Sequence, residues 1–221
     1  MALSSGGQLF ADTHPEGRQH AQSLLPMIDA QLARAGIGLR DLDGLAVVHG
    51  PGSFTGIRIA MSIAQGLAFA ADLPLYCESS LRCLAYAALQ SPSAPSAVNQ
   101  ILVASDARMH EFYWQMFSVD NAGLPQATGR PRADSYARFT ELLPPLNEHS
   151  LAVGKAWQLN AVAMPGCPCL PQLEADAATL LALLDREPDL EPFRFDPRHA
   201  EPLYVRNEVA WQKRQRLRPH Q

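Results

Sequence analysis

The sequence predicts an α/β fold, in which strands alternate with helices along the chain. Residues 45–49 (LAVVH) form a short apolar run with β-branched side chains, which is typical of a buried strand. Residues 55–71 have helical length, no proline and two apolar faces. Residues 73–77 then have the composition of the next strand. A strand, a helix and a second strand in this order indicate an α/β sheet.

The N-terminal part adds a hairpin and a helix. Residues 1–10 can form one hairpin around the Gly6-Gly7 pair. Residues 20–35 carry four apolar side chains at helical spacing: Leu24, Leu25, Ile28 and Leu32. Gly36 stands where a C-terminal cap belongs. Pro26 should start or kink this helix, because proline lacks the N–H of an interior helical bond.

A stretch rich in Pro, Ser and Ala at residues 90–99 separates this block from a second one. We interpret it as the linker between two α/β lobes, at residues 1–96 and 97–221. The second block is expected to contain strands at residues 101–104 and 111–119 and a helix at residues 175–185. Residues 187–202 are rich in proline and acidic side chains and are expected to be irregular.

Composition excludes several classes of protein. The 221 residues are 47% hydrophobic and 18% charged, which is too apolar for an intrinsically disordered chain. No run reaches the roughly 18 consecutive apolar residues of a membrane span, so we expect no transmembrane segment. The start of the chain lacks the basic and apolar regions of a secretory signal, which favours a cytoplasmic protein. A net charge of −4 argues against a protein that binds nucleic acid over its whole surface.

The sequence contains no pattern for a metal site or a catalytic nucleophile. The cysteines lack the paired spacing of a zinc site, and we expect four reduced thiols: Cys77, Cys83, Cys167 and Cys169. No two histidines stand one helical turn apart, as a pair of metal ligands on a helix would. There is also no G-x-S-x-G elbow. We therefore predict no metal and no catalytic residue in this chain.

A glycine-rich loop connects the strand at 45–49 to the helix at 55–71. Four of its residues are candidates for binding an anion: Gly50, Gly52, Ser53 and Thr55. Free N–H groups and the helix dipole converge at such a place and can hold a phosphate. The G-x-G-x-x-x-G spacing is neither the dinucleotide fingerprint nor a Walker loop, and no Lys follows the last glycine. A tight turn capped by Ser53 or Thr55 is therefore favoured over a nucleotide or anion loop.

Small side chains recur every four residues along the helix at 55–71: Gly56, Ala60, Ala64 and Ala68. Such a ridge lets another helix approach closely. Larger apolar residues occupy a different face: Ile59, Ile63 and Leu67. One face can therefore pack on the protein's own sheet and the other on a neighbouring molecule. The alternative is a helix sandwiched inside one chain.

Two charged groups each admit two interpretations. Asp106, Arg108 and Glu111 stand close to a strand start, where they can bind a ligand or, as we favour, tie a turn through an ion pair. Residues 212–221 contain four basic residues and no acid: Lys213, Arg214, Arg216 and Arg218. This tail can contact RNA phosphate, although such a run is more often a solvated end.

The loop sequence GPGSFTGIRI, followed by IAQGLA, resembles that of the bacterial TsaB family, also called YeaZ. Three further stretches agree with this family: RQHAQSLLPMID, SDARMHEFYW and AEPLYVRNEVAWQK. Members of the family assist in making threonylcarbamoyladenosine in tRNA. The resemblance covers nearly the whole chain.

The resemblance implies two lobes of the actin-like, ribonuclease-H-like ATPase architecture. It also implies a non-catalytic activating subunit of the complex that adds threonylcarbamoyl to N6 of adenosine 37 in tRNAs reading codons that begin with A. The catalytic partner would be the paralogue TsaD, bound as a heterodimer. The expected interface consists of the Gly56–Ala68 ridge and the four apolar residues from Leu24 to Leu32. TsaE would join the larger complex, ATP and metal would bind to TsaD, and tRNA would be held mainly by the complex. Alone, the chain can form a homodimer.

The sequence departs from the family in two places. TsaD binds metal through an H-x-x-x-H pair, and the matching stretch here, Ser79 to Cys83, keeps the spacing without the ligands. Family members begin with a strand of the type ILAIDTS about a dozen residues before the segment that matches residues 1–10, and this first strand is missing here. Either the start codon was assigned too late, or the first lobe has an unpaired sheet edge. The Asp of that strand lies near nucleotide phosphates in such folds, so its absence disfavours nucleotide binding.

Two other functions are open from the sequence. An actin-like small-molecule phosphotransferase, or kinase, would place the 50–56 loop at the phosphates and would turn over ATP on its own. A metallopeptidase would contain stoichiometric zinc.

Overall fold

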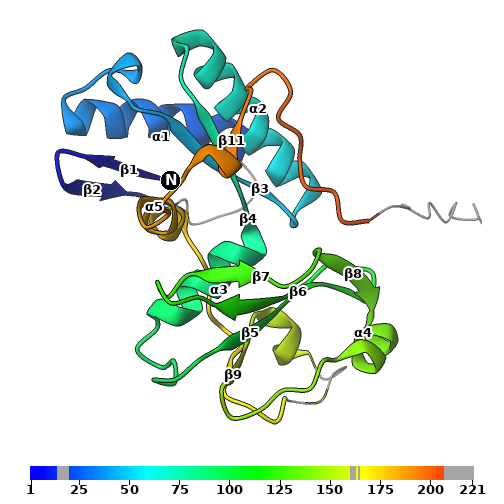
Figure 1. Cartoon of the computed structure of the whole chain (residues 1–221). Coiled ribbons are helices and arrows are strands. Elements are labelled where there is room, and N and C mark those ends of the chain that lie inside the picture. The colour runs from blue at the N-terminus through cyan, green and yellow to red at the C-terminus, as the bar shows by residue number, and fades with distance from the viewer. Residues whose placement is uncertain (14–19, 160–162, 164, 207–221) are drawn as a thin grey trace, which may run out of the picture.

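A computed structural model of the chain describes residues 1–13, 20–159, 163 and 165–206. Its elements form two lobes, which lie one above the other in Figure 1. The upper lobe contains a two-stranded hairpin and a three-stranded sheet, and the lower lobe contains a six-stranded sheet. The predicted α/β class is confirmed.

The upper lobe begins with the hairpin and continues with alternating helices and strands. Its elements are β1 (Ala2–Ser5), β2 (Gln8–Ala11), α1 (His20–Ala35), η1 (Leu39–Asp41), β3 (Leu45–Gly50), α2 (Phe54–Ala71) and β4 (Leu75–Ser79). The predicted hairpin is confirmed, and its two turn glycines have φ of 56° and 76°, which glycine adopts without steric cost. The two predicted strands and two predicted helices are confirmed within two residues at each end.

Helix α1 ends as predicted but passes through its proline. Gly36 has a φ of 68°, and its N–H and that of Ile37 donate to carbonyls of the last turn, at 3.2 and 3.1 Å. The helix begins six residues before Pro26, which therefore does not start it.

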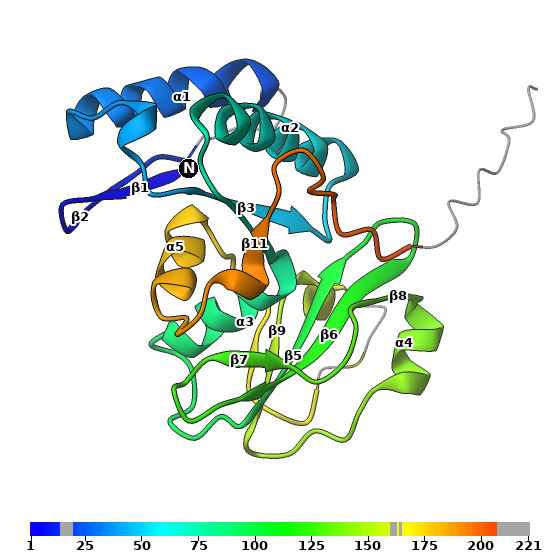
Figure 2. The ribbon, with the colours of Figure 1, turned by 45° about the horizontal axis from the view of Figure 1, so that its top comes forward.

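Helix α2 lies beside α1 on one face of the upper sheet (Figure 2). Met61 and Ala68 are buried against Val47, Leu75 and Cys77 of strands β3 and β4, which pair in parallel. Among the described helices, α2 is the one whose length and mean hydropathy of 1.3 would also suit a membrane span. Here its inner side is occupied by the sheet.

The lower lobe is built around two long antiparallel strands. Its elements are α3 (Ser80–Gln90), β5 (Gln100–Asp106), β6 (Glu111–Val119), β7 (Pro125–Ala127), β8 (Arg132–Ser135), α4 (Tyr136–Leu142), β9 (Ser150–Val153), η2 (Lys155–Gln158) and β10 (Cys169–Leu170). The strand order is β10-β9-β5-β6-β7, and β8 pairs with the other end of β6. Strands β5 and β6 confirm the two predicted strands of this block.

Strand β5 supplies both cores of the lower lobe, because its side chains alternate between the two faces of the sheet. Ile101 and Val103 pack against α3 in one core. Leu102 and Ala104 pack on the other face in an aromatic core: Phe112, Trp114, Phe139 and Trp157.

The last part of the chain returns to the upper lobe. Helix α5 (Ala177–Asp185) confirms the predicted helix at 175–185 and packs between α3 and strand β3. A short helix η3 (Glu191–Phe193) leads to strand β11 (Arg194–Phe195), which pairs antiparallel with β4. Residues 187–202 were predicted to be irregular, and this prediction is wrong in part because they contain η3 and β11. A two-residue strand has no sequence pattern of its own, since it forms only by pairing with the edge of β4. Strands β1–β4 precede the predicted boundary at 96 and 97, and the six-stranded sheet follows it. Helix α3 precedes the boundary but packs on the lower sheet, whereas α5 and β11 follow it and pack with the upper lobe.

Candidate functional site

The glycine-rich loop between β3 and α2 is closed by its own hydrogen bonds. Ser53 is the N-cap of α2: its Oγ accepts from the N–H of Gly56 at 3.3 Å, and its carbonyl accepts from Ile57 at 2.9 Å. Gly50 has a φ of 123°, and a Cβ there would lie 3.1 Å from the carbonyl oxygen of Leu203. The structure thus places Ser53 in the capping role that the sequence offered to Ser53 or Thr55, and the anion loop stays a prediction.

The stretch Ser79 to Cys83, which the resemblance matches to the metal-ligand spacing of TsaD, spans the end of β4 and the start of α3. Ser79 caps this helix by accepting from the N–H of Leu81, and the Ser80 hydroxyl donates to the Pro51 carbonyl at 2.5 Å. Cys83 is 1% exposed, and burial raises the pKa of its thiol far above the ordinary range. A neutral, buried thiol is a poor metal ligand. Within the described residues, no three His, Cys, Asp or Glu side chains are placed to hold a metal ion, and all four cysteines are free.

The predicted interface residues of α1 point mainly into the upper lobe. Leu24, Ile28 and Leu32 line a cavity beneath the helix, whereas Leu25 is 45% exposed. Of this set, Leu25 is therefore the side chain that the structure offers to a partner.

The predicted ridge on α2 also faces the chain's own sheet. Ala60 and Ala64 pack against the core that includes Val47, and Ala68 is 0% exposed within it. Ala68 is therefore unavailable to another molecule, and its assignment to the interface is wrong. Gly56 lies against its own cap residue, Ser53. The small side chains let α2 lie close to β3, which is the sandwiched alternative that the sequence left open.

A second ridge, two residues out of phase with the predicted one, faces outward from α2. It consists of exposed residues four apart: Phe54, Arg58, Ser62, Gly66 and Ala70. Phe69 lies next to it and is 67% exposed. We call these six residues the outer ridge. The sequence analysis missed it, although Ser62, Gly66 and Ala70 have the same four-residue spacing of small side chains.

Aromatic and basic groups gather at the start of the outer ridge. The Arg58 guanidinium lies 3.6 Å from the centroid of the Phe54 ring, and its Nε donates to the Tyr204 hydroxyl at 2.9 Å. Phe54 and Tyr204 are 57% and 51% exposed. Tyr204 belongs to the C-terminal segment, so this segment borders the outer ridge.

The charged group before β6 is tied within the protein. The N–H of Arg108 donates to Asp106 at 2.8 Å, and the Glu111 carboxylate pairs with Arg206 at 2.5 Å. Arg206 also donates to the Ala107 carbonyl at 2.8 Å. This is the turn-tying interpretation that the sequence favoured.

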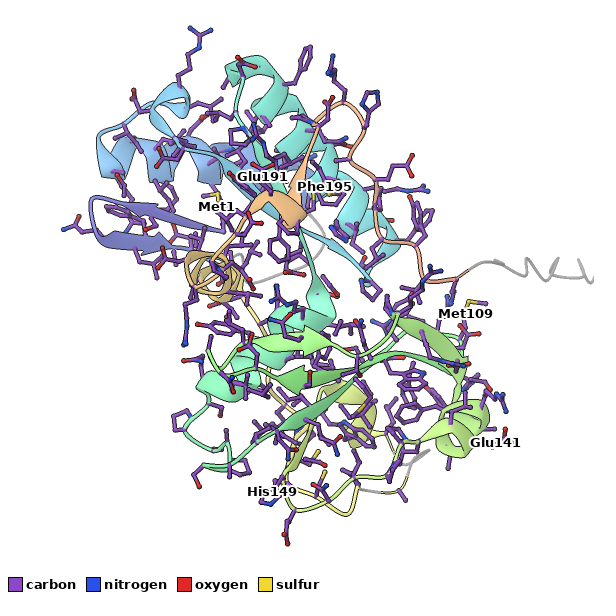
Figure 3. All side chains as sticks on the ribbon, in the orientation of Figure 1. Met1, Met109, Glu141, His149, Glu191 and Phe195 are labelled. Carbon is purple, nitrogen blue, oxygen red and sulfur yellow. The ribbon has the colours of Figure 1, made fainter. Side chains whose placement is uncertain are left out.

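Met109, at the tip of the turn, is 68% exposed and lies on the side of the C-terminal segment (Figure 3). The four basic residues of the predicted RNA-contacting tail lie outside the described residues.

Known proteins resemble the chain over most of its length. The family described as TsaD: tRNA N6-adenosine threonylcarbamoyltransferase matches residues 13–168. The tRNA threonylcarbamoyladenosine biosynthesis protein TsaB of Escherichia coli (strain K12) is 33% identical over 226 residues, which cover 96% of this chain and 92% of that protein. The protein of the same name from Haemophilus influenzae is 34% identical over 213 residues, which cover 89% and 84%.

A solved structure gives the same result for the fold. The solved structure of YeaZ from Pseudomonas aeruginosa superposes with a TM-score of 0.78 at 29% identity, covering 92% of each chain. This match, with that to the transferase family, confirms the two-lobed actin-like, ribonuclease-H-like architecture. The GPGSFTG loop and the small residues that recur every four positions along α2 agree with these relatives. The chain belongs to the TsaB (YeaZ) family of tRNA threonylcarbamoyladenosine biosynthesis proteins.

Proposed function

We propose that this chain is the non-catalytic activating subunit of the complex that adds threonylcarbamoyl to N6 of adenosine 37 in tRNAs reading codons that begin with A. It pairs with a TsaD-type transferase in the cytoplasm, and TsaE joins the larger complex. The names of the relatives from Escherichia coli and Haemophilus influenzae support this pathway. ATP, metal and most of the tRNA contact belong to the partners, and the chain alone can form a homodimer.

The interior of the chain supports a role without chemistry of its own. Ser79 and Cys83, which the resemblance matches to the metal-ligand positions of TsaD, are engaged as a helix cap and a core side chain. The Gly56 and Ile57 N–H groups, which an anion at the loop would use, already donate to Ser53. No observation favours the phosphotransferase or the metallopeptidase alternative.

Gly66 is the observation that carries the assignment of the partner surface. Glycine inside a helix costs about 1 kcal/mol relative to alanine. A Cβ built on Gly66 meets no atom within 4 Å, so nothing in the chain itself requires a glycine there. A neighbouring helix that crosses the outer ridge closely would require one. We therefore place the TsaD contact on the outer ridge and Leu25.

The test replaces Gly66 or Ser62 by arginine. Both positions are exposed, and arginine is the better helix former than glycine, so Gly66→Arg should melt at or above the parent temperature. A guanidinium in a close helix crossing costs several kcal/mol, which predicts at least about a 100-fold loss of affinity for TsaD. Calorimetric titration with TsaD measures the affinity, and threonylcarbamoyladenosine formation by the reconstituted complex measures the function.

Ala137→Arg is the matched control, because Ala137 is exposed on helix α4 of the lower lobe. It should bind and activate TsaD like the parent. Unchanged affinity in both ridge variants would show that TsaD binds elsewhere. Transfer activity by this chain with TsaD omitted would overturn the non-catalytic role.

A further inference from the structure

Helix α2 carries a single charge on a surface that is otherwise apolar or small. Of its 18 residues Arg58 alone is charged, so the helix contains no acid. Only 11% of the helix is buried, although its mean hydropathy is 1.3. An exposed apolar surface of this kind usually marks a contact with another molecule. Any such contact on the outer ridge must also accommodate the charge of Arg58.

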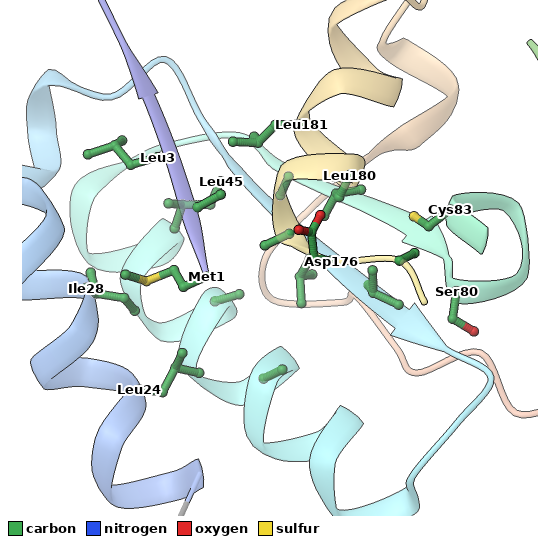
Figure 4. A pocket seen from close by; sticks show the side chains of 18 of the residues that line it. Met1, Leu3, Leu24, Ile28, Leu45, Ser80, Cys83, Asp176, Leu180 and Leu181 are labelled. Atoms are coloured by element: carbon green, nitrogen blue, oxygen red, sulfur yellow. The ribbon is translucent and has the colours of Figure 1, made fainter. Parts of the chain in front are cut away.

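The opposite side of α2 faces the interior of the upper lobe. Ala60 and Ala64 line a cavity whose walls are mainly apolar. Leu24 of α1 and Leu45 of β3 lie on its other sides (Figure 4). Arg58 is exposed and does not line this cavity. The interior beneath α2 is therefore not where its charge is neutralised.

The Arg58 side chain is held in place by neighbours on two sides. Its guanidinium lies 3.6 Å from the centroid of the Phe54 ring, and its Nε donates to the Tyr204 hydroxyl at 2.9 Å. The segment that contains Tyr204 is itself fastened to α2, because the Gln65 side chain donates to the Pro197 carbonyl at 2.8 Å. The orientation of the guanidinium is thus set before any partner arrives.

The outer end of this guanidinium is left for a ligand. Its Nη1 and Nη2 atoms carry four N–H donors, and none of them bonds to a described residue. No carboxylate of the described part of the chain lies within 4 Å of Arg58. The planar pair of Nη atoms matches the two oxygens of a carboxylate. A partner that removes water from Arg58 without supplying an anion would leave a buried charge uncompensated, which is strongly unfavourable.

We propose that Arg58 is the specificity-determining residue of the outer ridge: it pairs with a carboxylate that a TsaD-type transferase places opposite the start of α2. Tyr204 is its positioning residue. The inference rests on the proposed function, which assigns the outer ridge to TsaD. A second copy of the chain is a poorer match, because the six residues of its outer ridge include no acid. One charge that must meet its opposite also fixes the register of an otherwise apolar contact.

The first experiment measures the affinity of Arg58→Gln for TsaD by calorimetric titration. Glutamine keeps a polar side chain without the charge, and we expect at least about a 30-fold loss of affinity. The control is Arg130→Gln, which removes an exposed arginine of the lower lobe that forms no ion pair with a described residue. It changes the net charge equally and should bind TsaD like the parent.

Parental affinity of Arg58→Gln overturns the proposal. If Gly66→Arg binds weakly in the same series, TsaD still uses the outer ridge and the proposed function stands without the ion pair. If Gly66→Arg also binds like the parent, the proposed interface fails together with the inference.

The second experiment identifies the atom that Arg58 contacts. Arg58→Lys keeps the charge and supplies an amine, which a carbodiimide joins as an amide to a carboxylate in direct contact. We expect mass spectrometry of the complex to find position 58 joined to an Asp or Glu of TsaD. A cross-link to a carboxylate of this chain or of a second copy overturns the proposal. So does the absence of a cross-link from position 58 in a complex of parental affinity.

The third experiment tests whether Tyr204 acts through Arg58. Tyr204→Phe removes the hydroxyl that accepts from Nε and should weaken TsaD binding by about 3–10-fold. In the Arg58→Gln background the same change should cause no further loss, because the side chain that Tyr204 positions is gone. Equal losses in the two backgrounds would overturn the positioning role.

Discussion

Arg82 lies between two carboxylates at the junction of the lobes. Its guanidinium pairs with Glu78 at 2.6 Å and with Glu187, and its Nε donates to the Pro125 carbonyl at 2.8 Å. The three charged side chains are 6–8% exposed. Burial raises the pKa of Glu78, although the charge of Arg82 opposes that shift. This side chain of α3 thus connects strand β4, the segment after α5 and the start of β7.

We predict that Arg82→Ala destabilises the protein by about 3–5 kcal/mol, because it leaves two buried carboxylates without a cation. Urea denaturation at pH 7 measures the loss. The control is Arg194→Ala, which removes an exposed pair with Glu191 and should cost less than about 1 kcal/mol. Equal costs for the two variants would contradict the importance of burial for this pair.

The sequence gives no sign of this cluster at the level of single residues. Its members are 4 and 105 positions apart, and each would pass as a surface charge. Their burial depends on how α5 is placed against α3, which is a tertiary feature that no local pattern contains.

Helix α5 begins at a reciprocal cap. The Asp176 carboxylate accepts from the Thr179 N–H at 2.8 Å, and the Thr179 hydroxyl accepts from the Asp176 N–H at 3.4 Å. The hydrogen bond from the Thr179 backbone lowers the pKa of Asp176. The charged form is therefore favoured by folding.

Asp176→Ala should lower the free energy of unfolding by about 1 kcal/mol at pH 7, the usual cost of an N-cap. Because the pKa of Asp176 is lower when folded, its electrostatic contribution is complete above the unfolded value near 3.9 and is lost as the pH falls through the folded value. The difference in free energy of unfolding between the parent and Asp176→Ala should thus become smaller below about pH 4. Asp176→Asn keeps a capping side chain without the charge and should show no such pH dependence in thermal melts. If the free energies of unfolding of the parent and of Asp176→Ala differ by the same amount at pH 7 and pH 3, the charge of Asp176 does not contribute to the cap.

The elements that sequence reasoning identified are those with a strong period or a clear end signal. Helix α2 and strands β3, β5 and β6 are long or apolar enough to be found locally. Helix α3 was not predicted; it is buried on almost all sides, and its one charged side chain, Arg82, is itself buried. Strands β10 and β11 are two residues long and exist only as partners of β9 and β4.

Part of the candidate site could be predicted from the sequence and part could not. The sequence identified α1 and α2 as the helices of interest and small residues as the reason, but it selected the ridge that faces the sheet. Two ridges of equal spacing run along α2, and the sequence does not say which one the sheet covers. That choice depends on where β3 lies, which only the assembled lobe determines.

At the scale of the whole molecule, the C-terminal segment joins the two lobes. Strand β11 belongs to the upper sheet, and Arg206 reaches Glu111 and the Ala107 carbonyl of the lower lobe. Arg206→Ala should therefore cost about 1.5–3 kcal/mol, the value of hydrogen bonds to charged groups, and should speed tryptic cleavage after Arg198. Arg198→Ala removes an exposed pair with Asp196 and is the control for stability. If both variants unfold at the same urea concentration, Arg206 does not hold the segment.

The pairing of β11 with β4 also has a consequence for biosynthesis. Strand β4 leaves the ribosome roughly 115 residues before its partner β11. At about 5–20 residues per second, the first sheet waits about 6–23 s for its last strand. The N-terminal lobe is therefore completed only after the whole lower-lobe sheet has been synthesised, and until then a nascent chain exposes the edge of β4. A chaperone that covers strand edges during this interval would raise the yield of native protein.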